Sequence, residues 1–145
     1  MELAEIFNKL AEKEGFEHGE AQGDKSISEA EKALNISFPE EYKQFLRRFG
    51  YASWNGGRLY GISKNLRSNI VHKNKLIRET VFQPEEYRKL PEDAFLIEDY
   101  GDAFFMLFGN DSNRKGQVGL YLSEKSSWEE KNWASFKVFL EEYCL

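Results

Sequence analysis

The sequence predicts an α+β fold, and three observations along its 145 residues lead to that class. Apolar residues recur at helical spacing in the first third of the chain, three strand-like runs follow between residues 94 and 124, and a helical pattern closes the chain. This order is typical of a sheet covered by helices. We therefore expect a single domain over residues 1–145, with a mainly antiparallel sheet covered by N-terminal helices and a C-terminal helix.

Two helices are expected before residue 36. The first is expected because Leu3, Ile6, Phe7 and Leu10 recur at helical spacing, and Gly15 is expected to end it. Ser26 and Glu29 have the spacing of a capping box, in which each side chain bonds a free backbone N–H at the helix start. This spacing predicts a second helix over residues 27–34, and Asn35 after it tolerates the left-handed conformation.

A third helix begins at Pro39, because proline lacks a backbone donor and has the φ angle that the first turn needs. One apolar stripe then follows at i, i+3, i+4 and i+7, formed by Tyr42, Phe45, Leu46 and Phe49. Gly50 is well placed as the C-cap of this helix.

The glycine-rich loop after this helix raises the question of phosphate binding. Its glycines, Gly56, Gly57 and Gly61, fit neither of the common phosphate-binding patterns, and a strand rather than a helix follows them. We interpret the loop as a turn in which Gly56 and Gly57 supply positive φ on entry into a short strand. Trp54 and Tyr60 pack near this turn and offer an aromatic rim to a partner.

The second half of the chain contains the predicted sheet. Three strands are expected at "AFLIEDYG", "DAFFMLFG" and "QVGLYLSE", in an antiparallel meander whose first turn is Tyr100-Gly101-Asp102. The segment 64–90 favours a helix. The closing helix is expected from a shared apolar face of Trp133, Phe136, Leu140 and Tyr143, with Phe139 beside it.

Composition and charge exclude several functional classes. The longest apolar runs, such as "AFFMLF", are far short of the roughly 20 residues that span a bilayer, so no membrane helix is expected. The charged N-terminus lacks the features of a secretory signal, which predicts a cytoplasmic protein. Cys144 is the lone cysteine and is expected to be a reduced thiol.

The sequence shows no catalytic or metal-binding pattern. Its two histidines, His18 and His72, lie in separate segments without cysteine, histidine or patterned carboxylate partners at ligand spacing. No G-x-S-x-G motif is present for a serine nucleophile. We therefore expect no metal, no cofactor and no enzymatic activity.

Glu98, Asp99 and Asp102 lie in the densest acidic region of the chain, just after Glu92 and Asp93. They are interpreted as a solvated strand end, as a surface that faces a partner or, least favoured, as a paired-carboxylate catalytic site. An acidic patch is suited to a nuclease, because the nuclease surface that holds phosphates must be positive.

The opposing feature is a basic middle, since residues 61–90 carry seven bases and three acids although the net charge of the chain is −5. Five of these bases fall in the segment 64–78: Lys64, Arg67, Lys73, Lys75 and Arg78. They either contact phosphates or form the solvated face of a helix. In the second case the apolar side chains that pack inward are Leu66, Ile70, Val71 and Ile77.

The order "ISEAEKALNISFPEEYKQFLRRFGYASWNGGRLYGI" resembles the core signature of the SUKH superfamily (Smi/Knr-like domain), and "FLIEDYGDAFFMLF", "GQVGLYLSE" and "SFKVFLEEY" extend the likeness over residues 26–143. The resemblance implies an α+β domain and protein binding. Many bacterial members resemble immunity proteins, antitoxins that occupy polymorphic toxins, often nucleases. The resemblance supplies no catalytic residues.

We therefore expect a cytoplasmic immunity protein that neutralises a cognate toxin, with a nuclease domain as the expected target, by stoichiometric contact. The residues expected to contact this toxin are Trp54, Tyr60, Glu98, Asp99 and Asp102, because acids steer association and aromatics anchor interfaces. A scaffold or regulatory module, or a nucleic-acid-binding protein that uses residues 64–78, are the alternatives. The expected state is a monomer or a weak dimer.

Overall fold

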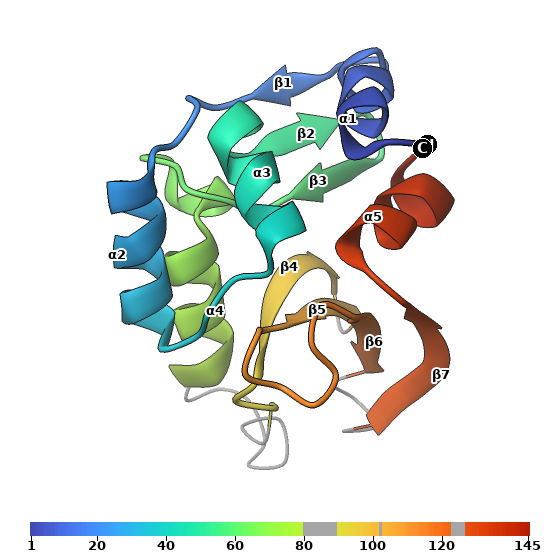
Figure 1. The fold of residues 1–145 in the computed structure, drawn as a ribbon. Helices are drawn as coiled ribbons and strands as arrows, with labels where there is room; N and C mark the ends of the chain where they lie inside the picture. The colour runs from blue at the N-terminus through green and yellow to red at the C-terminus, as the bar shows by residue number, and fades with distance from the viewer. Residues whose placement is uncertain (80–89, 102, 123–126) are drawn as a thin grey trace.

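The computed structural model describes residues 1–79, 90–101, 103–122 and 127–145 (Figure 1). Its helical elements are α1 (Leu3–Ala11), α2 (Asp24–Leu34), α3 (Glu40–Phe49), the 3-10 turn η1 (Leu66–Ser68), α4 (Ile70–Glu79), α5 (Phe136–Phe139) and the π-helical turn η3 (Leu140–Cys144). Its strands are β1 (Glu17–His18), β2 (Ala52–Trp54), β3 (Gly57–Leu59), β4 (Ala94–Tyr100), β5 (Ala103–Phe108), β6 (Val118–Leu122) and β7 (Ser127–Trp133).

The strands form two antiparallel sheets, one in the order β1-β2-β3 and the other in the order β4-β5-β6-β7. Tyr60 links the sheets, because its backbone N–H donates to the carbonyl of Ile97 in β4 at 2.9 Å. The α+β class and the meander of β4, β5 and β6 are therefore confirmed. The expectation of one sheet is incomplete, since a smaller sheet stands beside the meander (Figure 1).

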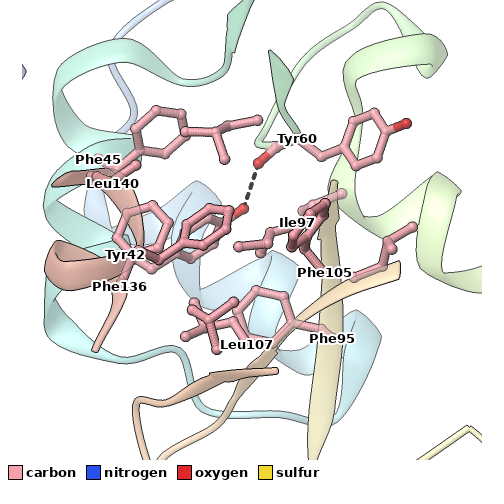
Figure 2. Packing of buried hydrophobic residues seen from close by; sticks show 14 of the residues in the cluster. Tyr42, Phe45, Tyr60, Phe95, Ile97, Phe105, Leu107, Phe136 and Leu140 are labelled. Atoms are coloured by element: carbon pink, nitrogen blue, oxygen red, sulfur yellow. Dashed lines mark hydrogen bonds between the residues drawn. The ribbon is translucent and has the colours of Figure 1, made fainter. Parts of the chain in front are cut away.

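The core lies between α3, the four-stranded sheet and the C-terminal helical segment (Figure 2). Tyr42 and Phe45 of α3 meet Phe95 of β4 and Phe136 of α5, with ring centroids 5.2 Å apart for Tyr42 and Phe95 and 5.9 Å apart for Phe45 and Phe136. The Tyr42 hydroxyl donates to the carbonyl of Tyr60 at 2.8 Å, so the buried polar atom has a partner. The apolar stripe predicted for α3, including Leu46, is confirmed as buried.

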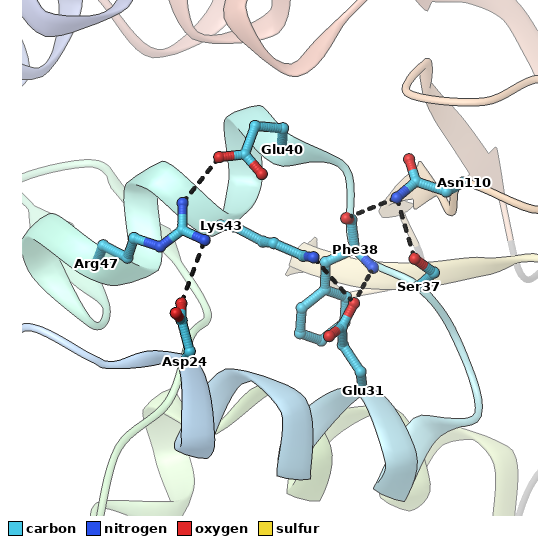
Figure 3. Close-up of polar contacts among 8 residues, drawn as sticks. All are labelled: Asp24, Glu31, Ser37, Phe38, Glu40, Lys43, Arg47 and Asn110. Atoms are coloured by element: carbon cyan, nitrogen blue, oxygen red, sulfur yellow. Dashed lines mark hydrogen bonds and ion pairs between the residues drawn. The ribbon is translucent and has the colours of Figure 1, made fainter.

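Polar contacts fix the connection between α2 and α3 (Figure 3). Glu31 of α2 accepts a hydrogen bond from the Phe38 N–H at 2.8 Å and lies 3.7 Å from the Lys43 ammonium. Asn110, which follows β5, donates to the Ser37 hydroxyl and to the Phe38 carbonyl, each at 3.0 Å. These bonds place Pro39, the N-cap of α3, and so set the direction of the helix that supports the core.

The ends of the two central helices match the glycine and asparagine signals. Asn35 ends α2 with φ 53°, and Gly50 ends α3 with φ 74°, as predicted. The prediction of a capping box at Ser26 is wrong, because α2 begins at Asp24 with Gly23 as its N-cap. Ser26 therefore lies in the first turn, where its hydroxyl donates to Gln22 Oε1 at 2.8 Å.

The C-terminal helix begins later than predicted. Trp133 belongs to the end of β7, and Ser135 caps the helix by accepting a hydrogen bond from the Val138 N–H at 3.1 Å. Trp133 still packs on this helix, with its ring 5.0 Å from Phe139. The apolar contact was thus predicted correctly and the secondary structure of Trp133 was not.

Most of the described part of the segment 64–90 is helical, in η1 and α4, which confirms the preference for a helix. The expected inward face is correct for Ile70, which is buried, and for Val71 and Ile77, which are half-buried. It is wrong for Leu66, which precedes the helix in η1 and is 57% exposed. Residues 80–89 of this segment lie outside the described residues.

Candidate binding site

The β2–β3 hairpin is one wall of the candidate site. Gly56 has φ 92°, as the turn requires, whereas Gly57 does not have positive φ, so this half of the expectation is wrong. The need for glycine at 57 is close packing, because an added Cβ atom would lie 2.5 Å from the indole of Trp54. Gly61 is needed for a similar reason, since a Cβ atom there would lie 1.7 Å from the carbonyl oxygen of Gly50.

A β-bulge in β4 decides which side chains meet this hairpin. Leu96 pairs with Met106, and Glu98 pairs with Phe105, so Ile97 is the extra residue. Without the bulge, Leu96 and Glu98 would share a face, because side chains in a strand alternate. The bulge instead places Glu98 on the same face as Phe105, beneath the C-terminal helical segment.

Glu98 and Tyr100 hold the hairpin from this face of β4. Glu98 Oε1 accepts a hydrogen bond from the backbone N–H of Arg58 at 3.2 Å. The Tyr100 hydroxyl donates to the carbonyl of Gly56 at 2.8 Å. Because both bonds reach the hairpin backbone, the wall of the site is tied to the central sheet at two points.

Glu98 is fully buried, and its second carboxylate oxygen, Oε2, has no hydrogen-bond partner among the described residues. Burial raises the pKa of Glu98 to about 7, against the opposing influence of Tyr100 and the Arg58 N–H. A carboxylate in this position therefore lowers stability when it is ionised. Burial and, to a smaller extent, the Glu98 carboxylate raise the pKa of the Cys144 thiol.

Asp99, the next residue of β4, lies on the opposite face of the strand from Glu98. Its Oδ1 accepts a hydrogen bond from the Tyr60 hydroxyl. Two cations lie over the Tyr60 ring, with Lys73 Nζ at 5.3 Å and Arg58 Cζ at 6.0 Å from its centroid. Burial and the bond to Asp99 raise the pKa of the Tyr60 hydroxyl, so this phenol stays neutral.

A pocket of about 410 Å³ opens between the hairpin and η1. Residues of its lining that bear on binding are Trp54, Arg58, Tyr60, Arg67, Ser68 and Tyr100. Arg58, Arg67 and Tyr100 are exposed, and Tyr100 is 41% accessible. The pocket thus combines exposed guanidinium groups with aromatic surface.

The structure brings four of the predicted contact residues together, but their side chains are less exposed than a contact surface requires. Trp54, Tyr60 and Glu98 are buried at 9%, 1% and 0% exposure, so the expected exposed charge of Glu98 is absent from the surface. Asp99 is half-buried. Asp102 lies outside the described residues. As an assignment of partner contacts, this set stays a prediction.

Sequence reasoning missed Arg58 as a site residue. Arg58 stands alone between Gly57 and Leu59, apart from the basic run that begins at Lys64. The signal that identifies it is the placement of bases on both sides of Tyr60 in the sequence, at Arg58 and Arg67.

Arg78, one of the bases considered for phosphate contact, has a structural role instead. Its guanidinium donates to the carbonyls of Pro91 and Ala94 at 2.9 and 2.8 Å. Burial lowers the pKa of Arg78. Asn74, in the same helix, is fully buried and bonds both the N–H and the carbonyl of Leu96, at 2.7 and 3.0 Å. This side of α4 therefore faces β4 rather than a ligand.

In the part of the chain that the structure describes, no cluster of three or more His, Cys, Asp or Glu side chains is placed to hold a metal ion. No helix among these described residues is long and apolar enough to cross a membrane.

Comparisons with known proteins agree with the fold. The SUKH_5 family model, described as SMI1-KNR4 cell-wall, matches residues 3–145. A solved structure described as "protein from Pseudomonas syringae pv. tomato" is similar with a TM-score of 0.73 at 15% identity, over 97% of this chain and 96% of that chain. No curated protein matches the sequence. The structural likeness is one of fold alone.

Proposed function

The chain belongs to the SMI1-KNR4 family, and from this we propose that it is an immunity-type protein that binds a protein toxin and neutralises it by occupying it. The observation that carries the proposal is the family match over residues 3–145. We propose further that residues 1–145 act as one cytoplasmic domain, without enzymatic activity of their own.

The proposed contact surface is the hairpin pocket together with the adjoining end of β4. Exposed aromatic and arginine side chains are the usual anchors of protein interfaces, and Tyr100 and Arg58 are of this kind. Trp54, Tyr60 and Glu98 support these groups from below, and Asp99 fixes the Tyr60 hydroxyl. The buried residues of the predicted contact set thus act through the residues that they position.

A nuclease is the proposed class of toxin. The chain has a net charge of −5, and the segment that follows α1 carries exposed acids, among them Glu12, Glu14, Glu17 and Glu20. A nuclease surface that holds phosphates is positive, so this charge would speed its association with the inhibitor. Complex formation would therefore weaken as the salt concentration rises.

The test is capture of the partner by the tagged full-length chain from its native cell lysate at moderate salt, followed by mass spectrometry. The expected result is one large multidomain protein in near-stoichiometric amount. Its C-terminal domain should stop growth when expressed alone, and co-expression of this chain should restore growth. Degradation of nucleic acid by that domain, inhibited at equal molar amounts, would identify a nuclease.

Other results of the same experiment contradict the proposal. Recovery of housekeeping proteins only, without a growth-arresting domain, would favour a scaffold or regulatory module. Recovery of nucleic acid whose binding declines steeply with salt would favour the segment 64–78 as a nucleic-acid-binding surface. Failure of co-expression to restore growth would reject the immunity function even if a toxin were captured.

A further inference from the structure

The exposed charge around the hairpin pocket is positive although the whole chain is negative. Arg58 and Arg67 line the pocket, and Lys73 lies beside it over the Tyr60 ring. Within the described ranges, the ion pairs involve the bases Lys43 and Arg47 only. The charges at the pocket are therefore not neutralised by a described carboxylate within ion-pair distance.

Glu98 and Asp99 of β4 are not among the residues that line the pocket. Glu98 is buried, and its Oε1 bonds the Arg58 backbone N–H rather than its guanidinium. Asp99 is half-buried and accepts the Tyr60 hydroxyl. Burial of Glu98 and the bond of Asp99 to Tyr60 thus leave the exposed guanidinium of Arg58 without an ion pair to either carboxylate.

The pocket is preformed. Its hairpin wall is held by Glu98 and Tyr100, and its floor is held by Tyr60, whose N–H donates to the Ile97 carbonyl and whose own carbonyl accepts the Tyr42 hydroxyl. A ligand that binds a fixed site loses less free energy to ordering the protein. About 410 Å³ is within the range of small ligand sites and accommodates a few side chains.

We infer that the hairpin pocket, bordered by Arg58, Arg67 and Lys73, binds an acidic segment of a partner protein that also places an apolar side chain against Tyr100. Guanidinium groups bind carboxylates through paired, charge-assisted hydrogen bonds, and Tyr100 supplies exposed aromatic surface beside them. The inference rests on the proposed function in taking the natural ligand to be a protein.

Net charge favours an acidic protein segment over a nucleic acid. A polyanion samples the whole surface, and the chain as a whole carries −5. A short acidic segment senses mainly the charges within a Debye length, about 8 to 10 Å at physiological salt, where the pocket is basic. The pocket also has a concave shape suited to a few side chains rather than a long groove that would follow a phosphate backbone.

The test uses the full-length chain as bait for a displayed library of random peptides, in wild-type form and as the variant Arg58→Glu/Arg67→Glu. A matched control, Lys9→Glu/Lys25→Glu, makes the same change in net charge at exposed positions of α1 and α2. Wild type and control should enrich peptides rich in Asp and Glu next to an aromatic or aliphatic residue. The pocket variant should lose them, with an affinity for an enriched peptide lower by about tenfold or more.

Three results would overturn the inference: no enrichment with wild type, enrichment of neutral or basic peptides, or equal enrichment with the pocket variant. A single-stranded RNA oligonucleotide serves as the competing probe. If it bound more tightly than the peptides and lost affinity in the pocket variant, the pocket would be a nucleic-acid site. Thermal unfolding of each variant checks that folding is intact, and Arg58→Gln/Arg67→Gln should give an intermediate loss.

This experiment separates the inference from the proposed function because it does not need the toxin. Acidic peptides without any captured toxin would support the pocket and reject the immunity function. A captured toxin whose affinity for the pocket variant equals that for wild type would support immunity and reject the pocket.

Discussion

The aromatic core around Tyr42 of α3 and the hairpin end of β4 are both buried, but their polar side-chain atoms differ in hydrogen bonding. In the core, the Tyr42 hydroxyl has its partner in the Tyr60 carbonyl, and aromatic rings and aliphatic side chains pack around it (Figure 2). At the hairpin end, Glu98 is just as buried, yet Oε2 has no partner among the described residues; Trp133 Nε1, at the end of β7, is the other buried side-chain atom among them without one. The hydrogen-bonded core therefore stabilises the fold, whereas the unpaired Glu98 oxygen lowers its stability. A destabilising buried group of this kind is typical of sites under functional constraint.

The largest effect is expected in the core. Phe45→Ala should lower the free energy of unfolding by about 3 to 5 kcal/mol, because it removes a buried ring and leaves a cavity between α3 and α5. Gln44→Ala, at the exposed neighbouring position, should change stability by less than about 0.5 kcal/mol. Chemical denaturation measures both. Similar losses for the two variants would contradict the described packing.

Asn74 tests whether a buried polar group can be as structural as the core. Asn74→Ala should cost about 3 to 4 kcal/mol, because the N–H and the carbonyl of Leu96 would both lose their partner inside the protein. Lys75→Ala, which is exposed in the same helix, is the control. A loss below about 1 kcal/mol for Asn74→Ala would mean that α4 does not dock on β4 in this way.

Glu98→Gln should act in the opposite direction and raise stability, because the pKa of Glu98 is near 7 in the folded protein and near 4.5 in the unfolded chain. Below pH 4.5 the carboxyl is protonated in both states and has no net effect on stability. As pH rises from there to 7, ionisation favours the unfolded state, so the wild type loses stability. Near pH 8 the variant should be more stable by about 2 to 3 kcal/mol.

Measurement of unfolding at several pH values tests this prediction, with Glu92→Gln as the exposed control. The gain from Glu98→Gln should shrink steadily toward pH 4.5. A variant that becomes less stable than wild type as pH rises above 4.5 would show instead that the ionised carboxylate stabilises the fold through its bond to the Arg58 N–H.

The smallest effect on stability is expected at the pocket rim. Arg58→Glu and Arg67→Glu should each change the free energy of unfolding by less than about 0.5 kcal/mol, since both side chains are exposed and form no ion pair with another described residue. Thermal denaturation is the check. A large loss would mean that these arginines serve the fold rather than a ligand.

The predictable parts of the fold are those whose signal is local. The stripe from Tyr42 to Phe49 and the terminating Gly50 specify α3 within about ten residues of sequence. The strand β7 was missed because most of its residues are polar and exposed, so it lacks apolar alternation. The strand β1 has two residues, and only its pairing with β2 defines it.

The sequence predicted part of the grouping of residues at the hairpin, but not which of their side chains are exposed. Trp54, Tyr60 and Asp99 were expected at one surface, and the structure brings them together. The burial of Glu98 depends on the bulge at Ile97, and a bulge arises from pairing with a distant strand rather than from the residues around it. Pairing between strands that are separate in sequence therefore decides which carboxylate reaches solvent.

The central claim is that the chain neutralises a protein by binding it at the hairpin pocket. The most direct measurement is growth of cells that express the captured toxin domain together with wild type, with Arg58→Glu/Arg67→Glu, or with the control Lys9→Glu/Lys25→Glu. Wild type and control should restore growth, and the pocket variant should not, although it folds with unchanged stability. Restoration by all three would contradict the pocket as the contact surface, and restoration by none would contradict neutralisation itself.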